Sequence, residues 1–172
     1  MVTPSSRYNL SGKERKKFIK EVNKLYPFLE RVLCNVRIIE LVKFKGLELY
    51  LVENRALFFK LKQDDRIYPT LINLLIHENI PWPSVTVDEG AVPYIRRGAD
   101  VMRPGIVKVE GDFVKGDVVA VKECKYGKPI ALGLALHTSE ELLGLKRGRV
   151  IRNLHYLGDD IWNMCIKFSN LR

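Results

Sequence analysis

The first apolar positions of this chain recur at helical spacing. Phe18, Val22 and Leu25 follow one another at i, i+4 and i+7, which is the pattern of one buried helix face. The segment Ser11-Gly12-Lys13-Glu14 before them is a capping box, in which the serine and the glutamate each satisfy a backbone N–H of the first turn. Pro27 cannot continue a helix. The pattern therefore predicts a helix that begins after Ser11 and ends before Pro27.

A different pattern follows from Leu29 to Leu61, where alternation and many β-branched and aromatic residues predict strands. Turn residues at Lys45-Gly46 and at Glu53-Asn54-Arg55 divide this segment. We expect two or three antiparallel strands that pack on the first helix. Pro69 then marks the first turn of a second helix, whose apolar run from Leu71 to Ile76 predicts burial.

The second half of the chain begins after Ile80-Pro81-Trp82-Pro83, a stiff apolar segment that indicates a packed domain boundary. We therefore predict an N-terminal α/β domain over residues 1–83 and a second domain over residues 84–172. Glycine turns at short intervals in the second domain are typical of a small barrel. Gly133 lies within an apolar strand and predicts a bulge or a close backbone approach. Residues 138–143 resemble a capped helical turn. The predicted fold class is α+β.

The composition gives the chain a net positive charge. The 172 residues are 47% hydrophobic and 28% charged, which is ordinary for a chain that folds throughout. The 29 Lys and Arg exceed the 20 Asp and Glu, and the resulting net charge of +9 favours a polyanionic partner. Three scattered cysteines support neither a disulfide framework nor a zinc site. With no long apolar run, we expect a cytoplasmic protein that does not enter membranes.

The most distinctive segment connects two strands, Val87 to Ile106, and reads VDEGAVPYIRRGADVMRPGI. Asp88 and Glu89 mark a helix start, and Pro93 fits its first turn. Gly98 is able to adopt the positive φ that ends a helix, and Pro104-Gly105 makes a second turn. Arg96, Arg97 and Arg103 are therefore predicted to lie near one another and to attract an anion. The alternative is that these arginines are solvated surface residues.

This connector resembles the opening of the PUA domain, the RNA-binding module named after pseudouridine synthases and archaeosine transglycosylases. A second segment, NLHYLGDDIWNM from Asn153 to Met164, resembles the closing strands of stand-alone PUA proteins related to the malignant T-cell-amplified translation factor. In that family a small pre-PUA domain precedes the PUA domain. The resemblance covers nearly the whole chain, and it implies an N-terminal pre-PUA domain followed by a PUA pseudobarrel.

The resemblance also implies a non-enzymatic protein that binds structured RNA, such as tRNA or ribosomal RNA. It places RNA against the short helix, the glycine loop with the strand that follows, and part of the closing strand. The residues that it assigns to RNA are Arg96, Arg97, Gly98, Ala99, Asp100 and Arg103, with Arg147, Arg149 and Arg152 as weaker candidates. Arginines suit phosphates and exposed bases. Tyr94, Tyr156 and Trp162 are expected in the core rather than at the RNA.

The first helix carries a second basic surface. Residues 1–27 hold seven Lys and Arg against two acidic residues. The lysines of this face are Lys13, Lys16, Lys17, Lys20 and Lys24. Such a face either binds phosphates without reading sequence or is the solvated side of an amphipathic helix. We expect it to be auxiliary to the arginine connector.

No catalytic site, metal site or cofactor is predicted. The sequence contains no Walker loop, dinucleotide-binding glycine fingerprint, HExxH helix or nucleophile elbow. The pairs Asp64-Asp65 and Asp159-Asp160 are expected to be solvated loop residues. His77, His137 and His155 have no partner at catalytic or ligand spacing.

The family resemblance further implies partners in translation, namely the small ribosomal subunit and a second translation factor. Two alternatives to RNA binding follow from it. One is a protein-interaction module that pairs with that factor, and the other is an accessory subunit for RNA modification. Salt separates RNA binding from an apolar protein interface, because only the former weakens steeply as salt rises.

Overall fold

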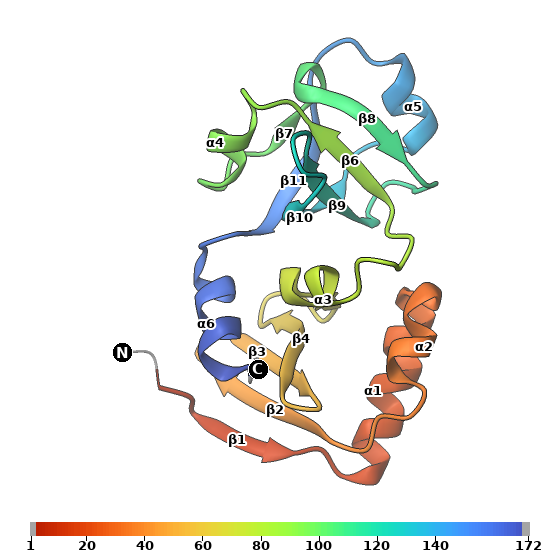
Figure 1. Ribbon diagram of the computed structural model, residues 1–172. Coiled ribbons are helices and arrows are strands. Elements are labelled where there is room, and N and C mark those ends of the chain that lie inside the picture. The colour runs from red at the N-terminus through yellow and green to blue at the C-terminus, as the bar shows by residue number, and fades with distance from the viewer. Residues whose placement is uncertain (1–2, 170–172) are drawn as a thin grey trace. The chain divides into compact units, whose positions relative to one another are not determined.

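The computed structural model describes residues 3–169. The chain divides into two compact units, Met1–Asn73 with Met164–Arg172, and Leu74–Asn163. The predicted boundary between residues 83 and 84 stays a prediction. Both units mix helices and strands, so the predicted α+β class is confirmed (Figure 1).

The first unit is built on a five-stranded antiparallel sheet in the order β1-β2-β3-β4-β5 (Figure 1). Its strands are β1 (Ser6–Asn9), β2 (Ile39–Phe44), β3 (Leu47–Val52), β4 (Arg55–Leu61) and β5 (Ile67–Pro69), and its helices are α1 (Gly12–Leu25), the 3₁₀ turn η1 (Pro27–Leu29) and α2 (Glu30–Leu33). The two predicted hairpin turns are confirmed, one between β2 and β3 and the other between β3 and β4. β1 and β5 are strands that the pattern did not indicate. Helix α3 (Leu71–Ile76) follows β5 and ends beyond the boundary of the unit.

Helix α1 begins at the predicted capping box. Ser11 accepts a hydrogen bond from the N–H of Glu14, and the Glu14 carboxylate accepts one from the N–H of Ser11. The apolar face of α1 packs on the sheet through Phe18, whose ring stacks on Tyr50 at 4.5 Å and meets Phe58 edge-on at 5.6 Å. These contacts confirm that the first helix covers the antiparallel strands.

The other face of this sheet contacts helix α6 (Asp160–Phe168). Phe44 is on the opposite face from Tyr50, because Leu41 pairs with Tyr50 and side chains alternate along β2. Phe168, at the end of helix α6 (Asp160–Phe168), meets Phe44 edge-on at 5.3 Å. Residues far apart in sequence therefore complete the first unit.

The prediction of strand structure from Leu29 to Leu33 is wrong, because these residues lie in η1 and α2. Pro27 opens a 3₁₀ turn, and Leu29 and Leu33 are both buried at the i, i+4 spacing of a helix. Their spacing also satisfies an alternating pattern, so short apolar runs of this kind do not distinguish the two structures.

The second unit contains a six-stranded sheet in the order β7-β11-β10-β9-β6-β8. Its strands are β6 (Ser84–Val87), β7 (Val101–Met102), β8 (Ile106–Glu110), β9 (Val118–Glu123), β10 (Pro129–Ala135) and β11 (Arg149–Tyr156). Its short helices are α4 (Val92–Ile95), the 3₁₀ turn η2 (Arg103–Gly105) and α5 (Ser139–Gly144), and the first turn of α6 also belongs to it. β6 and β9 are parallel, and the other pairs are antiparallel.

The sheet of the second unit curls, as the prediction of a pseudobarrel requires. Its two edge strands, β7 and β8, are joined by only the three residues of η2. Backbone hydrogen bonds from Asp88 N to Gly105 O at 2.9 Å and from Arg103 N to Gly148 O at 2.8 Å tie this short connection to its neighbours. The side chains inside the curl form one apolar core that includes Val87, Ile95 and Ile151.

Gly133 confirms the predicted close approach. The pairing of β10 with β11 shifts register between Leu132 and Gly133. A Cβ atom on Gly133 would lie 2.6 Å from the carbonyl oxygen of Arg152. Only a residue without a side chain fits there.

The prediction of closing strands from Asn153 to Met164 is right only as far as Tyr156, where β11 ends. The following residues turn into α6, and Asp159 caps this helix by accepting a hydrogen bond from the N–H of Trp162 at 2.7 Å. The carboxylate of Asp159 also contacts Nδ1 of His155, which is fully buried. The expectation that Asp159 is a solvated loop residue is therefore wrong, and the helix was missed because its cap also resembles a turn.

Candidate nucleic-acid interface

The connector from Val87 to Ile106 folds as its turn chemistry predicts. Asp88 accepts a hydrogen bond from the N–H of Ala91 at 2.9 Å just before α4, and Pro93 lies in the first turn of that helix. Gly98 has a φ of +92°, the left-handed conformation that ends the helix without strain. The connector thus makes a tight bend at one side of the curled sheet.

Asn153 of β11 fixes this bend from a distance. Its Nδ2 donates hydrogen bonds to the carbonyl oxygens of Ile95 and Ala99, both at 3.0 Å, and its backbone N–H donates to Asp100 at 2.8 Å. Asp100 also pairs with Arg149 at 3.1 Å. Sequence reasoning missed Asn153, although it is the first residue of the downstream segment that resembles the PUA family.

The bend and the start of β11 present three cationic side chains. Arg96, Arg97 and Arg149 are exposed. Nε of Arg97 donates to the carbonyl oxygen of Pro93 at 3.0 Å, which holds the guanidinium 5.6 Å from the ring centroid of Tyr94. Because this hydrogen bond uses only Nε, the N–H donors of the two Nη groups are left for a ligand.

Tyr94 corrects the expectation that the aromatics near the connector belong to the core. Its side chain is 63% exposed. Tyr156, in contrast, packs against the core of the second unit, and Trp162 is half-buried. An exposed tyrosine beside an ordered arginine suits the stacking of an unpaired base. The local pattern gave no sign of this, because Ile95 beside Tyr94 is buried.

Arg103 does not join the other arginines through its side chain. Its Nε donates to the carbonyl oxygen of Leu142 at 2.8 Å, and its Nη1 donates to that of Ile106 at 3.1 Å. The guanidinium is thus turned toward the backbone of neighbouring elements and helps to hold η2 in place. The predicted cluster of Arg96, Arg97 and Arg103 is therefore wrong for its third member.

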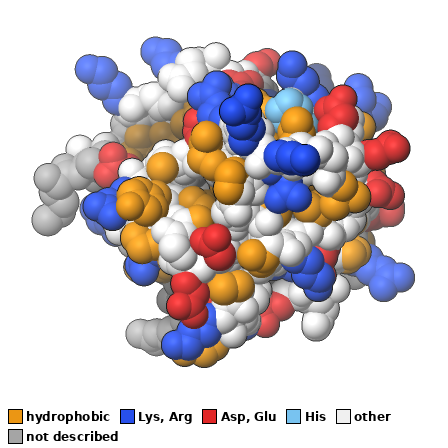
Figure 2. Space-filling model, turned by 90° about the horizontal axis from the view of Figure 1, so that it is seen from above, with side chains coloured by type: hydrophobic (Ala, Val, Ile, Leu, Met, Phe, Trp, Pro, Cys, Tyr) orange, Lys and Arg blue, Asp and Glu red, His pale blue; other side chains and the backbone are white. Residues whose placement is uncertain are grey.

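A groove of about 650 Å³ runs beside the bend. The exposed side chains of Tyr94, Met102 and Arg149 line it, together with Ala91 and Ala99. Figure 2 looks onto the side of the second unit that carries α4, β8 and α5, and blue Lys and Arg side chains lie beside orange hydrophobic ones there. We call Tyr94, Arg96, Arg97 and Arg149, with this groove, the arginine surface. It combines cations with apolar and aromatic area.

The other predicted residues are distributed over both units. Arg147 is exposed in the loop before β11, and Arg152 is exposed on β11, where its backbone pairs with Leu134 of β10. The lysines of the first basic face, Lys13, Lys16, Lys17, Lys20 and Lys24, are all exposed on α1 in the other unit. Gly98, Ala99 and Asp100 form the bend itself. Whether these residues contact RNA stays a prediction.

Among residues 3–169, no group of three or more His, Cys, Asp or Glu side chains is placed to hold a metal ion. Over the same described range, no helix is both long enough and apolar enough to cross a membrane. Asp64, the other carboxylate of interest, accepts hydrogen bonds from the N–H of Arg66 and from the Tyr68 hydroxyl.

Comparison with known families agrees with this geometry. The PUA domain family matches residues 83–157, which contain the whole arginine surface. A second family, described as a domain of unknown function, DUF1947, matches residues 6–77. The two matches leave only short segments of the chain uncovered.

Relatives extend over nearly the full length. Uncharacterized protein MJ1432 of Methanocaldococcus jannaschii is 37% identical over 91% of this chain and 95% of its own. Translation machinery-associated protein 20 is 29% identical in Saccharomyces cerevisiae, over 88% of this chain and 86% of its own, and 30% identical in Schizosaccharomyces pombe, over 83% and 82%. The crystal structure of a PUA domain protein from Aeropyrum pernix, in complex with tartrate, superposes with a TM-score of 0.79 and 31% identity, covering 94% of this chain and 91% of that one.

Proposed function

This chain belongs to the family of stand-alone PUA proteins that includes translation machinery-associated protein 20, and we propose that it is a non-enzymatic protein that binds structured RNA. The arginine surface carries this proposal. Hydrogen bonds that exist before any ligand arrives hold the bend and the side chains of Arg97 and Arg149, which lowers the cost of ordering them on binding.

The chemistry of the surface fits RNA better than it fits duplex DNA or an acidic protein. Guanidinium groups bind phosphates with paired hydrogen bonds, and the exposed ring of Tyr94 offers a stacking surface for an unpaired base. A groove that is largely apolar suits the faces of bases that have left a helix. We infer that the ligand is a loop, bulge or end of a folded RNA.

The setting we propose is translation, with tRNA or ribosomal RNA of the small subunit as the ligand. Support comes from the relatives whose name associates them with the translation machinery. A net charge of +9 adds long-range attraction to any RNA assembly. A second translation factor and the lysine face of α1 are further proposed contacts, which act in addition to the arginine surface.

Fluorescence anisotropy with labelled tRNA and with a labelled small-subunit rRNA fragment tests the proposal. We expect binding at low salt that weakens steeply as salt rises, and a loss of about tenfold or more when Arg97 and Arg149 are both replaced by Glu. Lys146→Glu in the exposed loop before β11 is the matched control, and it should weaken binding far less. Binding that ignores both salt and the double replacement would refute the proposal and favour a protein-interaction module.

A further inference from the structure

The turn between β9 and β10 is held by the side chain of one residue, Glu123. The carboxylate of Glu123 accepts hydrogen bonds from the backbone N–H groups of Lys125 at 2.7 Å, Tyr126 at 2.8 Å and Lys128 at 3.2 Å. Gly127 takes a φ of +66° within the same turn. One side chain thus fixes the path of the whole turn.

This ordered turn displays an aromatic ring among cations. Tyr126 is 71% exposed, which makes it the most exposed of the large hydrophobic side chains in the described part of the chain. Nζ of Lys125 lies 5.2 Å from its ring centroid. Lys122 and Lys128 flank the same turn from β9 and from the start of β10. The turn therefore places an exposed aromatic ring among three lysines.

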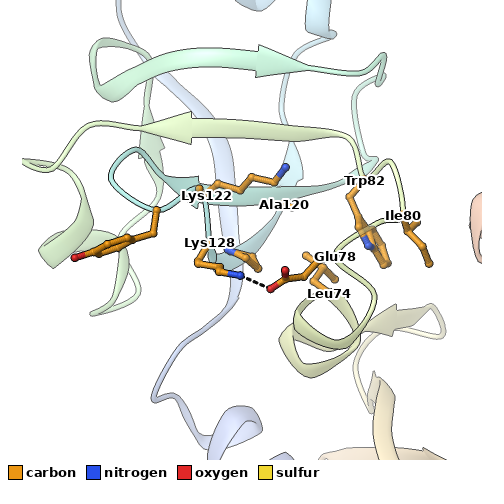
Figure 3. Close-up of a pocket in the computed structure, with 10 residues that line it drawn as sticks. Leu74, Glu78, Ile80, Trp82, Ala120, Lys122 and Lys128 are labelled. Carbon is orange, nitrogen blue, oxygen red and sulfur yellow. Dashed lines mark hydrogen bonds and ion pairs between the residues drawn. The ribbon is translucent and has the colours of Figure 1, made fainter.

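A cavity of about 210 Å³ opens beside the turn, within the second unit (Figure 3). Its inner wall is apolar and consists of Leu74, Ile80, Trp82, Ala120 and Pro129. Its remaining wall carries Tyr126, Lys122 and the ion pair of Lys128 with Glu78, which is drawn as a dashed line in Figure 3. The cavity therefore combines apolar side chains on part of its wall with one carboxylate and two ammonium groups on the rest.

The size and lining of this cavity restrict its ligand. Sites for complete drug-sized ligands occupy about 300–1,000 Å³, so a smaller cavity admits a single ring system rather than a whole ligand. A nucleobase is flat and apolar on its faces and carries donors and acceptors on its edge. Glu78 and Lys128 offer an acceptor and a donor to such an edge. Lys125, beside the Tyr126 ring, and Lys122, which lies 3.9 Å from Glu110, offer cations to the adjoining phosphates.

We propose that the β9–β10 turn and its cavity form a second RNA contact, which receives one unstacked nucleotide of a bound RNA. This inference rests on the proposed function but uses residues other than those of the arginine surface. The base inserts beside Trp82 or stacks on Tyr126, and the lysines of the turn contact its phosphates. The two contacts would act together on one RNA, which increases affinity by linking two binding events.

Tryptophan fluorescence tests the inference directly, because the chain has only two tryptophans, Trp82 and Trp162. In a Trp162→Phe protein the remaining emission reports on the cavity. The probe is an unstructured oligoribonucleotide of about 8 nucleotides, within the range of single-strand binding sites. We expect this RNA to quench Trp82, and we expect AMP and GMP alone to do so only at much higher concentration.

Variants separate the two RNA contacts. In the same background, Tyr126→Ala should weaken oligonucleotide binding about five- to a hundredfold, as loss of one stacked base does. Tyr126→Phe should keep most of the affinity. Tyr8→Ala removes another exposed tyrosine, 40% accessible on β1, and should leave affinity unchanged. Arg97→Glu should weaken binding but leave the quenching at saturation intact.

The outcomes distinguish failure of this inference from failure of the proposed function. RNA binding that needs Arg97 but neither quenches Trp82 nor responds to Tyr126→Ala would overturn the second contact and leave the proposed function standing. Equal affinity for AMP and for the oligonucleotide would overturn it in favour of a free-nucleotide site. Absence of all RNA binding would refute both.

Discussion

Replacing Asn153 by Ala tests whether the arginine surface depends on its remote anchor. The change removes two hydrogen bonds of 3.0 Å, from Nδ2 to the carbonyl oxygens of Ile95 and Ala99, and leaves the backbone N–H bond to Asp100 in place. The carbonyl of Ile95 keeps a second donor, the N–H of Gly98 at 3.0 Å. The replacement therefore removes two ordinary hydrogen bonds and does not leave the Ile95 carbonyl oxygen without a donor.

Each such bond contributes about 0.5–1.5 kcal/mol, so Asn153→Ala should lower the free energy of unfolding by about 1–3 kcal/mol. Oδ1 of Asn153 is buried without a hydrogen-bond partner among the described residues, and its removal offsets part of the loss. We therefore expect Asn153→Ala to lower the free energy of unfolding, measured with urea, by about 1–2 kcal/mol. RNA affinity should also fall, because the bend that carries Arg97 becomes free to move.

Two further replacements make this experiment decisive. Asn153→Asp keeps the shape but turns a donor toward two carbonyl oxygens into an acceptor, so it should cost more than Asn153→Ala. Asn163→Ala removes a single exposed hydrogen bond to Gly158 of 3.3 Å and should change stability by less than about 0.5 kcal/mol. If Asn153→Ala and wild type bind RNA equally tightly after correction for the unfolded fraction, the anchored bend has no part in recognition.

Three other predictions follow from particular contacts. Gly133→Ala should lower the free energy of unfolding by about 1–3 kcal/mol in thermal or urea unfolding, because the new Cβ would lie 2.6 Å from the Arg152 carbonyl oxygen. Gly144→Ala is the control, because its Cβ would meet open space and the stability should change little. Equal effects of the two replacements would refute the packing argument. Arg103→Ala should lower the free energy of unfolding by about 3–6 kcal/mol in the same assay, because two hydrogen bonds from a charged group are lost at about 1.5–3 kcal/mol each. An unchanged midpoint would contradict this. Loss of solvation raises the pKa of Glu123, but the three backbone N–H donors of its turn outweigh this effect and hold that pKa below its usual value of 4.5. The hydrogen bonds of the turn should therefore persist above pH 4.5 and be lost only as the pH falls through the lowered pKa. Hydrogen exchange of the amides in the turn measures this, and faster exchange already near neutral pH would contradict it.

The connector was predictable because its structure is local. Asp88, Pro93 and Gly98 each specify a backbone conformation within a few residues, and all three occupy the positions that their chemistry predicts. The same holds for the capping box at Ser11. Gly133 was also predictable, because a glycine in an apolar strand leaves few alternatives to a bulge or a close approach.

The errors concern side chains whose roles depend on distant segments. Asn153 reaches the bend across more than 50 residues of sequence, so no local pattern reveals it. Arg103 points to Leu142, 39 residues away, and thereby leaves the arginine cluster. Tyr94 is exposed although its neighbour Ile95 is buried, because successive side chains of a helix point in different directions. Spacing alone could not decide which arginine faces a ligand.

The dependence of RNA affinity on salt tests the central claim most directly, when Arg97→Ala and Arg103→Ala are compared with wild type. Removing one phosphate contact lowers the slope of log affinity against log salt by about 0.7–0.9. The exposed Arg97 should produce this change, and the inward-turned Arg103 should leave the slope unaltered even if its loss weakens the fold. An unchanged slope for Arg97→Ala, or an equal change for both variants, would contradict binding of RNA by the arginine surface.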